Sequence, residues 1–220
     1  MKKFVFFVFT FITLWLLQAT AQQQPRFWDD VQTIKKFDKI YAHPQTPILF
    51  TGSSSIRKWD DLELSFASYK AMNRGIGGAV INDIIFYADD LIFAYKPRQI
   101  VLYIGENDLG DEASTPDSIL ARTKHLFEII REKMPDVPVV YISIKPSPVR
   151  DRFMAKAIEC NKLIKEFLKT DKHTVYVDVF SKMITKEGRS MPELFLDDML
   201  HMNGKGYAIW YDAILPYLLK

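Results

Sequence analysis

The chain has 220 residues, and its formal net charge at pH 7 is only +2. Its lysines and arginines are scattered rather than clustered, which argues against nucleic acid or another polyanion as a partner. The one cysteine, Cys160, excludes an intramolecular disulfide, so an apolar core has to hold the fold together. Cys160 lies in a helical pattern and is expected to be a buried packing residue rather than a nucleophile.

The first 21 residues have the pattern of a secretory signal peptide. Two lysines precede an uncharged run from Phe4 to Leu17, and Ala19-Thr20-Ala21 is a small-x-small cleavage site. A helix made of that run spans about 21 Å, which is too short to cross roughly 30 Å of hydrocarbon. We expect cleavage after Ala21, which removes two lysines and no acid and lowers the formal net charge from +2 to 0. The sequence thus predicts export to the periplasm or outside the cell, without a stable membrane span.

The remaining residues, 22–220, are expected to form a single domain in which strands and helices alternate. Short apolar, β-branched runs predict strands at 47–52, 69–75, 99–105, 137–144 and 174–179. Helical patterns lie between and after them, at about 55–66, 80–94, 116–133, 150–169 and 203–219. Strands that are apolar throughout and separated by helices are typical of a parallel sheet covered on both faces. The predicted fold is therefore α/β, with about five parallel strands.

Polar loops follow the first four predicted strands. They contain, in order, "GSSSI", "NRGIGG", "GENDLGD" and "KPSPVR". In parallel sheets, ligands bind beyond the carboxyl ends of the strands, where these loops converge. We therefore expect all four loops to meet at one edge of the sheet.

The serines of the first loop suggest nucleophilic catalysis, which needs a base and a group that orients the base. Of the four histidines, His201 stands in "DDMLH", three residues after Asp198 and four after Asp197. A carboxylate at either spacing can reach the imidazole. An ordinary polar turn ahead of the last helix is the alternative interpretation of the same segment.

Hydrogen-bond donors for a developing oxyanion could come from the second and third loops. "NRGIGG" supplies backbone N–H groups at Gly75, Gly77 and Gly78, and "GEND" supplies the side-chain amide of Asn107. Each segment alone is also typical of an ordinary turn.

Several competing motifs fail on their details. "GSSSI" lacks the closing glycine of the α/β-hydrolase nucleophile elbow. Neither a phosphate-binding nor a dinucleotide-binding glycine pattern is present, and "DLGDEASTPD" lacks the spacing of a calcium loop. The histidines and the cysteine form no zinc spacing. No metal or cofactor is therefore expected.

Taken in order, "FTGSSSI", "NRGIGG", "GEND" and "DDMLH" resemble the motifs of the SGNH hydrolases, also called GDSL-like lipases and acylhydrolases. "GSSSIR" is most similar to the branch related to platelet-activating-factor acetylhydrolases, and Ser53 stands where the family has an aspartate. The resemblance covers the chain from about Pro47 to the last helix. It implies a flavodoxin-like three-layer α/β/α sandwich.

The resemblance also implies roles for individual residues. Ser54, two residues after Gly52, best matches the nucleophile among the three serines, and Asp198 and His201 match the orienting acid and the base. The oxyanion hole would consist of the N–H groups of Ser54 and Gly78 and the amide of Asn107, with Gly77 and Gly75 as weaker matches. With neutral imidazole as the base, the rate should fall below about pH 6.

These inferences predict an exported serine esterase that acts through an acyl-enzyme on short acyl or acetyl esters, including esters of carbohydrates. Two alternatives stay open: a lysophospholipase or lipase-like activity, and a non-catalytic glycan-binding protein on the same fold. Arg150 could line the pocket or lie on the surface, and Trp59 is expected to pack in the core rather than form a sugar platform.

Overall fold

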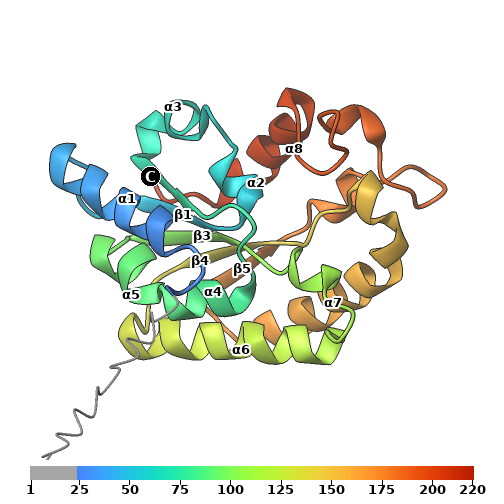
Figure 1. Cartoon of the computed structure of the whole chain (residues 1–220), viewed down its shortest axis with the longest axis horizontal. Coiled ribbons are helices and arrows are strands. Elements are labelled where there is room, and N and C mark those ends of the chain that lie inside the picture. Colours follow the sequence, from blue (N-terminus) through green and yellow to red (C-terminus); the bar gives the residue numbers. More distant parts are fainter. Residues whose placement is uncertain (1–23) are drawn as a thin grey trace, which may run out of the picture.

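The computed structural model describes residues 24–220, and the predicted signal peptide lies outside these residues. Its centre is a five-stranded sheet with strand order β2-β1-β3-β4-β5 (Figure 1). Every neighbouring pair of strands is parallel. The strands are β1 (Ile48–Gly52), β2 (Ala71–Gly75), β3 (Gln99–Tyr103), β4 (Val139–Ile142) and β5 (Thr174–Val177). The predicted α/β fold with five parallel strands is confirmed.

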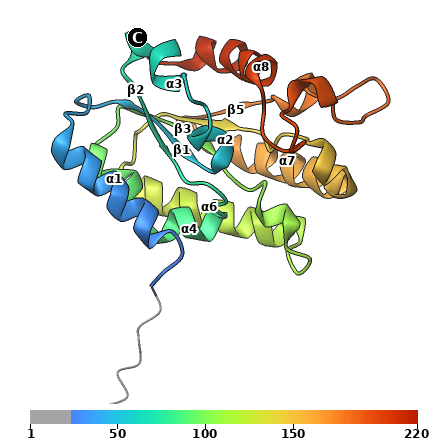
Figure 2. The ribbon, with the colours of Figure 1, turned by 45° about the horizontal axis from the view of Figure 1, so that its top comes forward.

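Helices cover both faces of the sheet (Figures 1 and 2). One face carries α1 (Trp28–Ile40), α4 (Ile81–Phe86), α5 (Ala88–Leu91), α6 (Pro116–Lys133) and α7 (Met154–Leu168). The other face carries α2 (Ser54–Arg57), α3 (Leu62–Ser65) and α8 (Gly204–Ile214). The strands alternate between two cores as the pleat requires: Leu49 packs into the first and its neighbours Ile48 and Phe50 into the second.

Aromatic side chains fill the core beneath α8. Trp59 is 2% exposed and packs edge-on against Phe50, Phe66 and Trp210. The prediction that Trp59 is a core residue is therefore confirmed. Cys160 is also buried as predicted, and burial raises the pKa of its thiol to about 11, which disfavours the reactive thiolate.

Helix α1 was not predicted from the sequence. Val31 is its only fully buried residue, so little of this helix belongs to the core. The predicted helix 55–66 is divided into α2 and α3, because the chain turns between them and places Trp59 in the core. The predicted helix 80–94 is divided into α4 and α5 at Tyr87, which is also buried.

The last two predicted helices are shorter than expected. The predicted helix 150–169 begins as a 3-10 segment, Pro148–Phe153, and becomes α-helical only at Met154. The predicted helix 203–219 ends at Ile214 and continues as the 3-10 turn Leu215–Tyr217, where Pro216 lacks the N–H that would continue the helix.

Gly52 ends β1 in a conformation that only glycine adopts easily. Its φ is +126°, and a Cβ atom there would lie 1.8 Å from the carbonyl oxygen of Tyr103 on β3. Backbone atoms of a central strand cannot move aside for it, so the turn after β1 requires glycine.

We predict that Gly52→Ala lowers the free energy of unfolding by more than about 3 kcal/mol, because it adds a strained φ to a backbone clash. Urea denaturation would measure the loss. Gly110→Ala is the matched control, since nothing lies within 4 Å of a Cβ at that position and its φ is not positive. Equal unfolding midpoints for the two variants would contradict the prediction.

Candidate functional site

Ser54 is the first residue of α2, directly after the turn that ends β1. His201 Nδ1 lies 2.6 Å from Asp198 Oδ2, and because a carboxylate only accepts hydrogen bonds, Nδ1 carries the proton. Nε2 of His201 is then an acceptor, and Ser54 Oγ donates to it at 3.0 Å. One chain of hydrogen bonds therefore joins Ser54, His201 and Asp198, although 147 and 144 positions of sequence separate Ser54 from the other two.

The Asp198 carboxylate is held from several sides. Its Oδ1 accepts from the backbone N–H groups of His201 at 2.8 Å and Leu200 at 3.0 Å. Partial burial would raise the pKa of Asp198, but these bonds and the bond from the imidazole outweigh it and hold that pKa well below its usual range. Of the two carboxylates left open by the sequence, the one in contact with the imidazole is Asp198 rather than Asp197.

The segment that carries these two residues is a tight loop ahead of α8. Leu196 N–H donates to the carbonyl of His201 at 2.8 Å, and Phe195 pairs with Met202 in an antiparallel bridge. Asn203 then caps α8 by accepting from the N–H groups of Lys205 and Gly206. Short-range contacts therefore place His201 at the base of the loop.

The loops after β2 and β3 also lie side by side. Asn107 Nδ2 donates to the carbonyl of Ala79 at 2.9 Å, next to Gly78, whose φ is +80°. Asn107 Oδ1 accepts from Arg150 at 2.8 Å, and this contact assigns the orientation of the amide. Among residues 24–220, the second N–H of that amide has no hydrogen-bond partner and is available for a ligand.

Asp108, the last residue of "GEND", has a different role. Asp108 is fully buried, and its carboxylate accepts a hydrogen bond from Arg122 at 2.9 Å. It also accepts from the backbone N–H of Ile81, the first residue of α4, at 3.1 Å. Burial raises the pKa of Asp108, against the opposing effect of Arg122. Asp108 therefore ties the loop after β3 to the start of α4, three residues after Gly78.

The two weaker oxyanion matches both face α2. A Cβ at Gly75 would lie 2.4 Å from the backbone N of Arg57, and a Cβ at Gly77 would lie 3.2 Å from the Arg57 guanidinium. Asn73 bridges the same region, since its side chain donates to Ile56 O at 2.7 Å and accepts from Gly75 N–H at 3.0 Å. Close packing of β2 and the loop after it on α2 therefore explains why glycine occupies positions 75 and 77.

Sequence reasoning missed three charged residues near this group. Lys58 Nζ lies 3.3 Å from His201 Nδ1, and because both atoms carry protons this contact is not a hydrogen bond. Lys145 and Glu106 form a buried ion pair at 2.9 Å beneath the loops. The only sequence signal for the pair was the position of both residues just after predicted strands.

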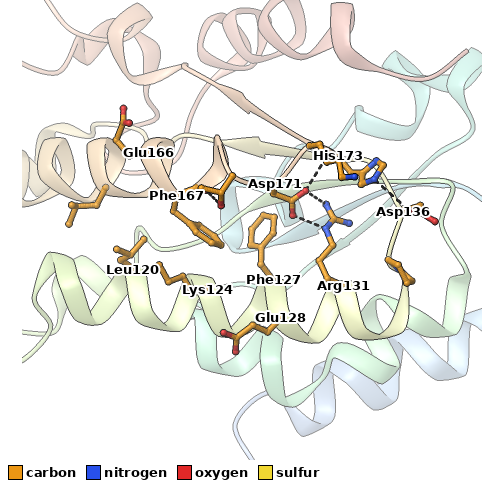
Figure 3. Close-up of a pocket in the computed structure, with 14 residues that line it drawn as sticks. Leu120, Lys124, Phe127, Glu128, Arg131, Asp136, Glu166, Phe167, Asp171 and His173 are labelled. Atoms are coloured by element: carbon orange, nitrogen blue, oxygen red, sulfur yellow. Dashed lines mark hydrogen bonds and ion pairs between the residues drawn. The ribbon is translucent and has the colours of Figure 1, made fainter.

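A large cavity of about 860 Å³ lies elsewhere, between α6 and α7 (Figure 3). Asp136 and His173, which precede β4 and β5, line it, so it opens at the amino ends of the strands, opposite the loops described above. Four of its lining groups form two pairs: Arg131 donates to Asp171 at 2.7 Å, and His173 lies 3.4 Å from Asp136. The cavity contains no residue of the group around Ser54.

Two further features concern the described residues, 24–220. No group of three or more histidine, cysteine, aspartate or glutamate side chains in this range could hold a metal ion. In the same range, no helix is both long and apolar enough to cross a membrane.

The fold is an α/β/α sandwich with a Ser-His-Asp chain of hydrogen bonds beyond the carboxyl ends of its strands. Residues 46–209 match the family model for the GDSL-like lipase/acylhydrolase family, and the chain belongs to that family. No curated protein sequence matches the chain.

Solved structures show the same fold at low sequence identity. A protein from Streptococcus pneumonia, assigned provisionally as a platelet activating factor, has a TM-score of 0.77 and 22% identity over 87% of this chain and 92% of its own. A GDSL-like lipase from Bacteroides thetaiotaomicron has a TM-score of 0.74 and 19% identity, with coverages of 86% and 97%. An acetyl xylan esterase from Geobacillus stearothermophilus has a TM-score of 0.62 and 16% identity, with coverages of 79% and 95%.

We predict that His201→Ala raises the pKa of Asp198 toward the ordinary value of about 3.9, because the imidazole hydrogen bond is lost. In the wild type the pKa of Asp198 is lower in the folded than in the unfolded state. Ionised Asp198 therefore stabilises the fold at any pH above the unfolded-state pKa, and this stability is lost as the pH falls through the folded-state pKa. Carbon-13 NMR of the labelled carboxyl group would follow the titration. His173→Ala, at the far edge of the sheet, should leave the Asp198 titration unchanged; identical curves for all three proteins would contradict the assignment.

Proposed function

We propose that the protein is an exported serine esterase that hydrolyses short acyl esters, including acetyl esters of carbohydrates, through an acyl-enzyme. The observation that carries this proposal is the continuous chain of hydrogen bonds from Ser54 through His201 to Asp198, with distances of 3.0 and 2.6 Å. Membership of the GDSL-like lipase/acylhydrolase family supports an ester substrate. Export rests on the N-terminal sequence.

In the first half of the reaction, Ser54 Oγ attacks the ester carbonyl carbon while its proton passes to Nε2 of His201. The resulting imidazolium is stabilised by the ionised carboxylate of Asp198. His201 then gives this proton to the oxygen of the leaving alcohol, and the acyl group stays on Ser54. In the second half, His201 takes a proton from water as the water oxygen attacks the acyl carbon. The bond from this carbon to Ser54 Oγ then breaks, His201 returns the proton to Oγ, and the acid is released.

The negative charge that develops on the carbonyl oxygen needs preorganised donors. The proposed donors are the backbone N–H groups of Ser54 and Gly78 and the free N–H of Asn107. The Arg150 guanidinium donates to Asn107 Oδ1, which turns the amide nitrogen toward Ala79 and places positive charge beside the same amide. Arg150 thus supports the oxyanion site, whichever ester is bound.

Two cations near the proposed site support a polar leaving alcohol. Lys58 Nζ lies 3.3 Å from His201 Nδ1, and Arg150 donates to Asn107 Oδ1. A similar fold occurs in an acetyl xylan esterase, which supports an acetylated carbohydrate as one substrate class. A lipase-like activity is the second candidate, since GDSL-like lipases share the fold and the family.

Hydrolysis of p-nitrophenyl acetate, butyrate and octanoate tests the proposal. We expect the wild type to prefer acetate, and Ser54→Ala to lose on the order of 10⁶ of the rate, as removal of a serine nucleophile can. Ser53→Ala and Ser55→Ala are matched controls, because both side chains are buried and their Oγ atoms have no partner among residues 24–220. These two variants should stay active.

Each other outcome is informative. If Ser54→Ala keeps the rate while a neighbouring variant loses it, the nucleophile is misassigned. If octanoate is the best substrate, the lipase-like alternative is correct. If the folded wild type hydrolyses none of these esters or acetylated xylan, the non-catalytic glycan-binding alternative is favoured.

We predict that kcat/KM falls with a slope of one on the acid side of its profile between pH 4.5 and 8, because the proposed reaction needs a neutral imidazole as the base. Asp198 should not add a second proton in this range, since its pKa is held well below the usual value. A pH profile of acetate hydrolysis from pH 4.5 to 8 would measure the slope. A flat profile would contradict the assignment of His201, and a slope of two would contradict the lowered pKa of Asp198.

A further inference from the structure

Lys145 follows β4 and is fully buried, although lysine is normally exposed. Its ammonium group has three protons and three partners. Nζ donates to Glu106 Oε1 at 2.9 Å and to the carbonyl oxygen of Leu200 at 2.8 Å, and it lies 5.2 Å from the centre of the Phe195 ring. Leu200 and Phe195 both belong to the loop that carries His201.

Glu106, in the loop after β3, is equally well bound. Its Oε2 accepts from the Tyr103 hydroxyl at 2.7 Å, and its Oε1 accepts from Ser147 at 3.3 Å as well as from Lys145. Burial lowers the pKa of Lys145, and the Glu106 carboxylate opposes that shift. Glu106 thereby holds the ammonium in place beneath the loop.

A buried ion pair is a poor source of stability, because desolvation of both charges offsets their attraction. Apolar side chains of similar volume would fill the same space at no greater cost. The pair is therefore better explained by the other hydrogen bond of the Lys145 ammonium, which goes to the carbonyl oxygen of Leu200.

The carbonyl of Leu200 and the N–H of His201 belong to one peptide unit, which is planar and moves as a rigid body. Lys145 binds its oxygen at 2.8 Å, and Asp198 Oδ1 binds its N–H at 2.8 Å. The peptide plane is thus held from both sides. Its orientation sets the direction in which the His201 side chain leaves the backbone, toward Ser54.

We propose that Lys145 is a positioning residue for His201: its ammonium fixes the 200–201 peptide plane from below, and Glu106 holds the ammonium there. The proposal deepens the proposed function, on which it rests. Misplacement of a catalytic group by about 1 Å can cost 10²-fold in rate, so the loss of this bond should appear in kcat.

The test uses the double variant Lys145→Met/Glu106→Gln, which removes the bond to Leu200 without leaving an unpaired buried charge. We expect kcat for p-nitrophenyl acetate to fall by about 10- to 100-fold, with KM changed by less than about twofold. Should this variant fail to fold by circular dichroism, Lys145→Gln/Glu106→Gln takes its place, since its shorter side chain does not reach Leu200.

One control separates positioning from stability. Arg131→Met/Asp171→Asn removes another ion pair, at the far edge of the sheet, where its two distances are 2.7 and 3.1 Å (Figure 3). It should lower the unfolding temperature and leave kcat unchanged.

The Nδ1–H proton of His201 gives a readout that does not depend on any substrate. In the wild type its bond to Asp198 should produce a downfield proton NMR resonance, which the Lys145→Met/Glu106→Gln variant should shift or broaden and the Arg131→Met/Asp171→Asn variant should not. An unchanged resonance and an unchanged kcat in the folded Lys145 variant would overturn the proposal. If the wild type hydrolyses no ester, the proposed function fails while the resonance still tests the positioning role.

Discussion

The parallel pairing of β1 with both β2 and β3 is the constraint on which the rest of the structure depends. Gly52 is opposite Gly75 on one side and Tyr103 on the other, so three strands end at the same level. The loops that follow these three strands therefore meet at that edge of the sheet. Close approach at Gly52, where a side chain would strike the backbone of β3, keeps the level fixed.

Beneath the meeting point lies a layer of buried polar groups rather than an apolar core. Asp108 joins the loop after β3 to α4 and α6, and Glu106 joins the same loop to Lys145 after β4. Each of these groups has its partners, so the layer is rigid without unpaired charge. Such a layer contributes little net stability and gives the loops above it fixed positions.

The His201 loop has the opposite character, because its geometry is mostly local. The contacts from Asp198 to His201 and Leu200 span three residues or fewer, and the antiparallel bridge and the cap of α8 close the loop on itself. Lys145 adds a long-range contact that orients this loop toward Ser54. The locally formed loop and this buried charge together bring the imidazole to the hydroxyl.

The sequence by itself determined the alternation of buried strands and helices, because apolar runs of this length and spacing have few other solutions, and it determined the candidates Ser54, Asp198 and His201 through short motifs. It also left Asp198 and Asp197 as alternatives, since both spacings allow contact. Only the tertiary structure decided between them, and it alone showed the long-range pair of Lys145 and Glu106, which are 39 positions apart. Local patterns record contacts between near neighbours in the chain. The breaks at Trp59 and Tyr87 were missed because packing against distant segments, rather than local periodicity, decides them.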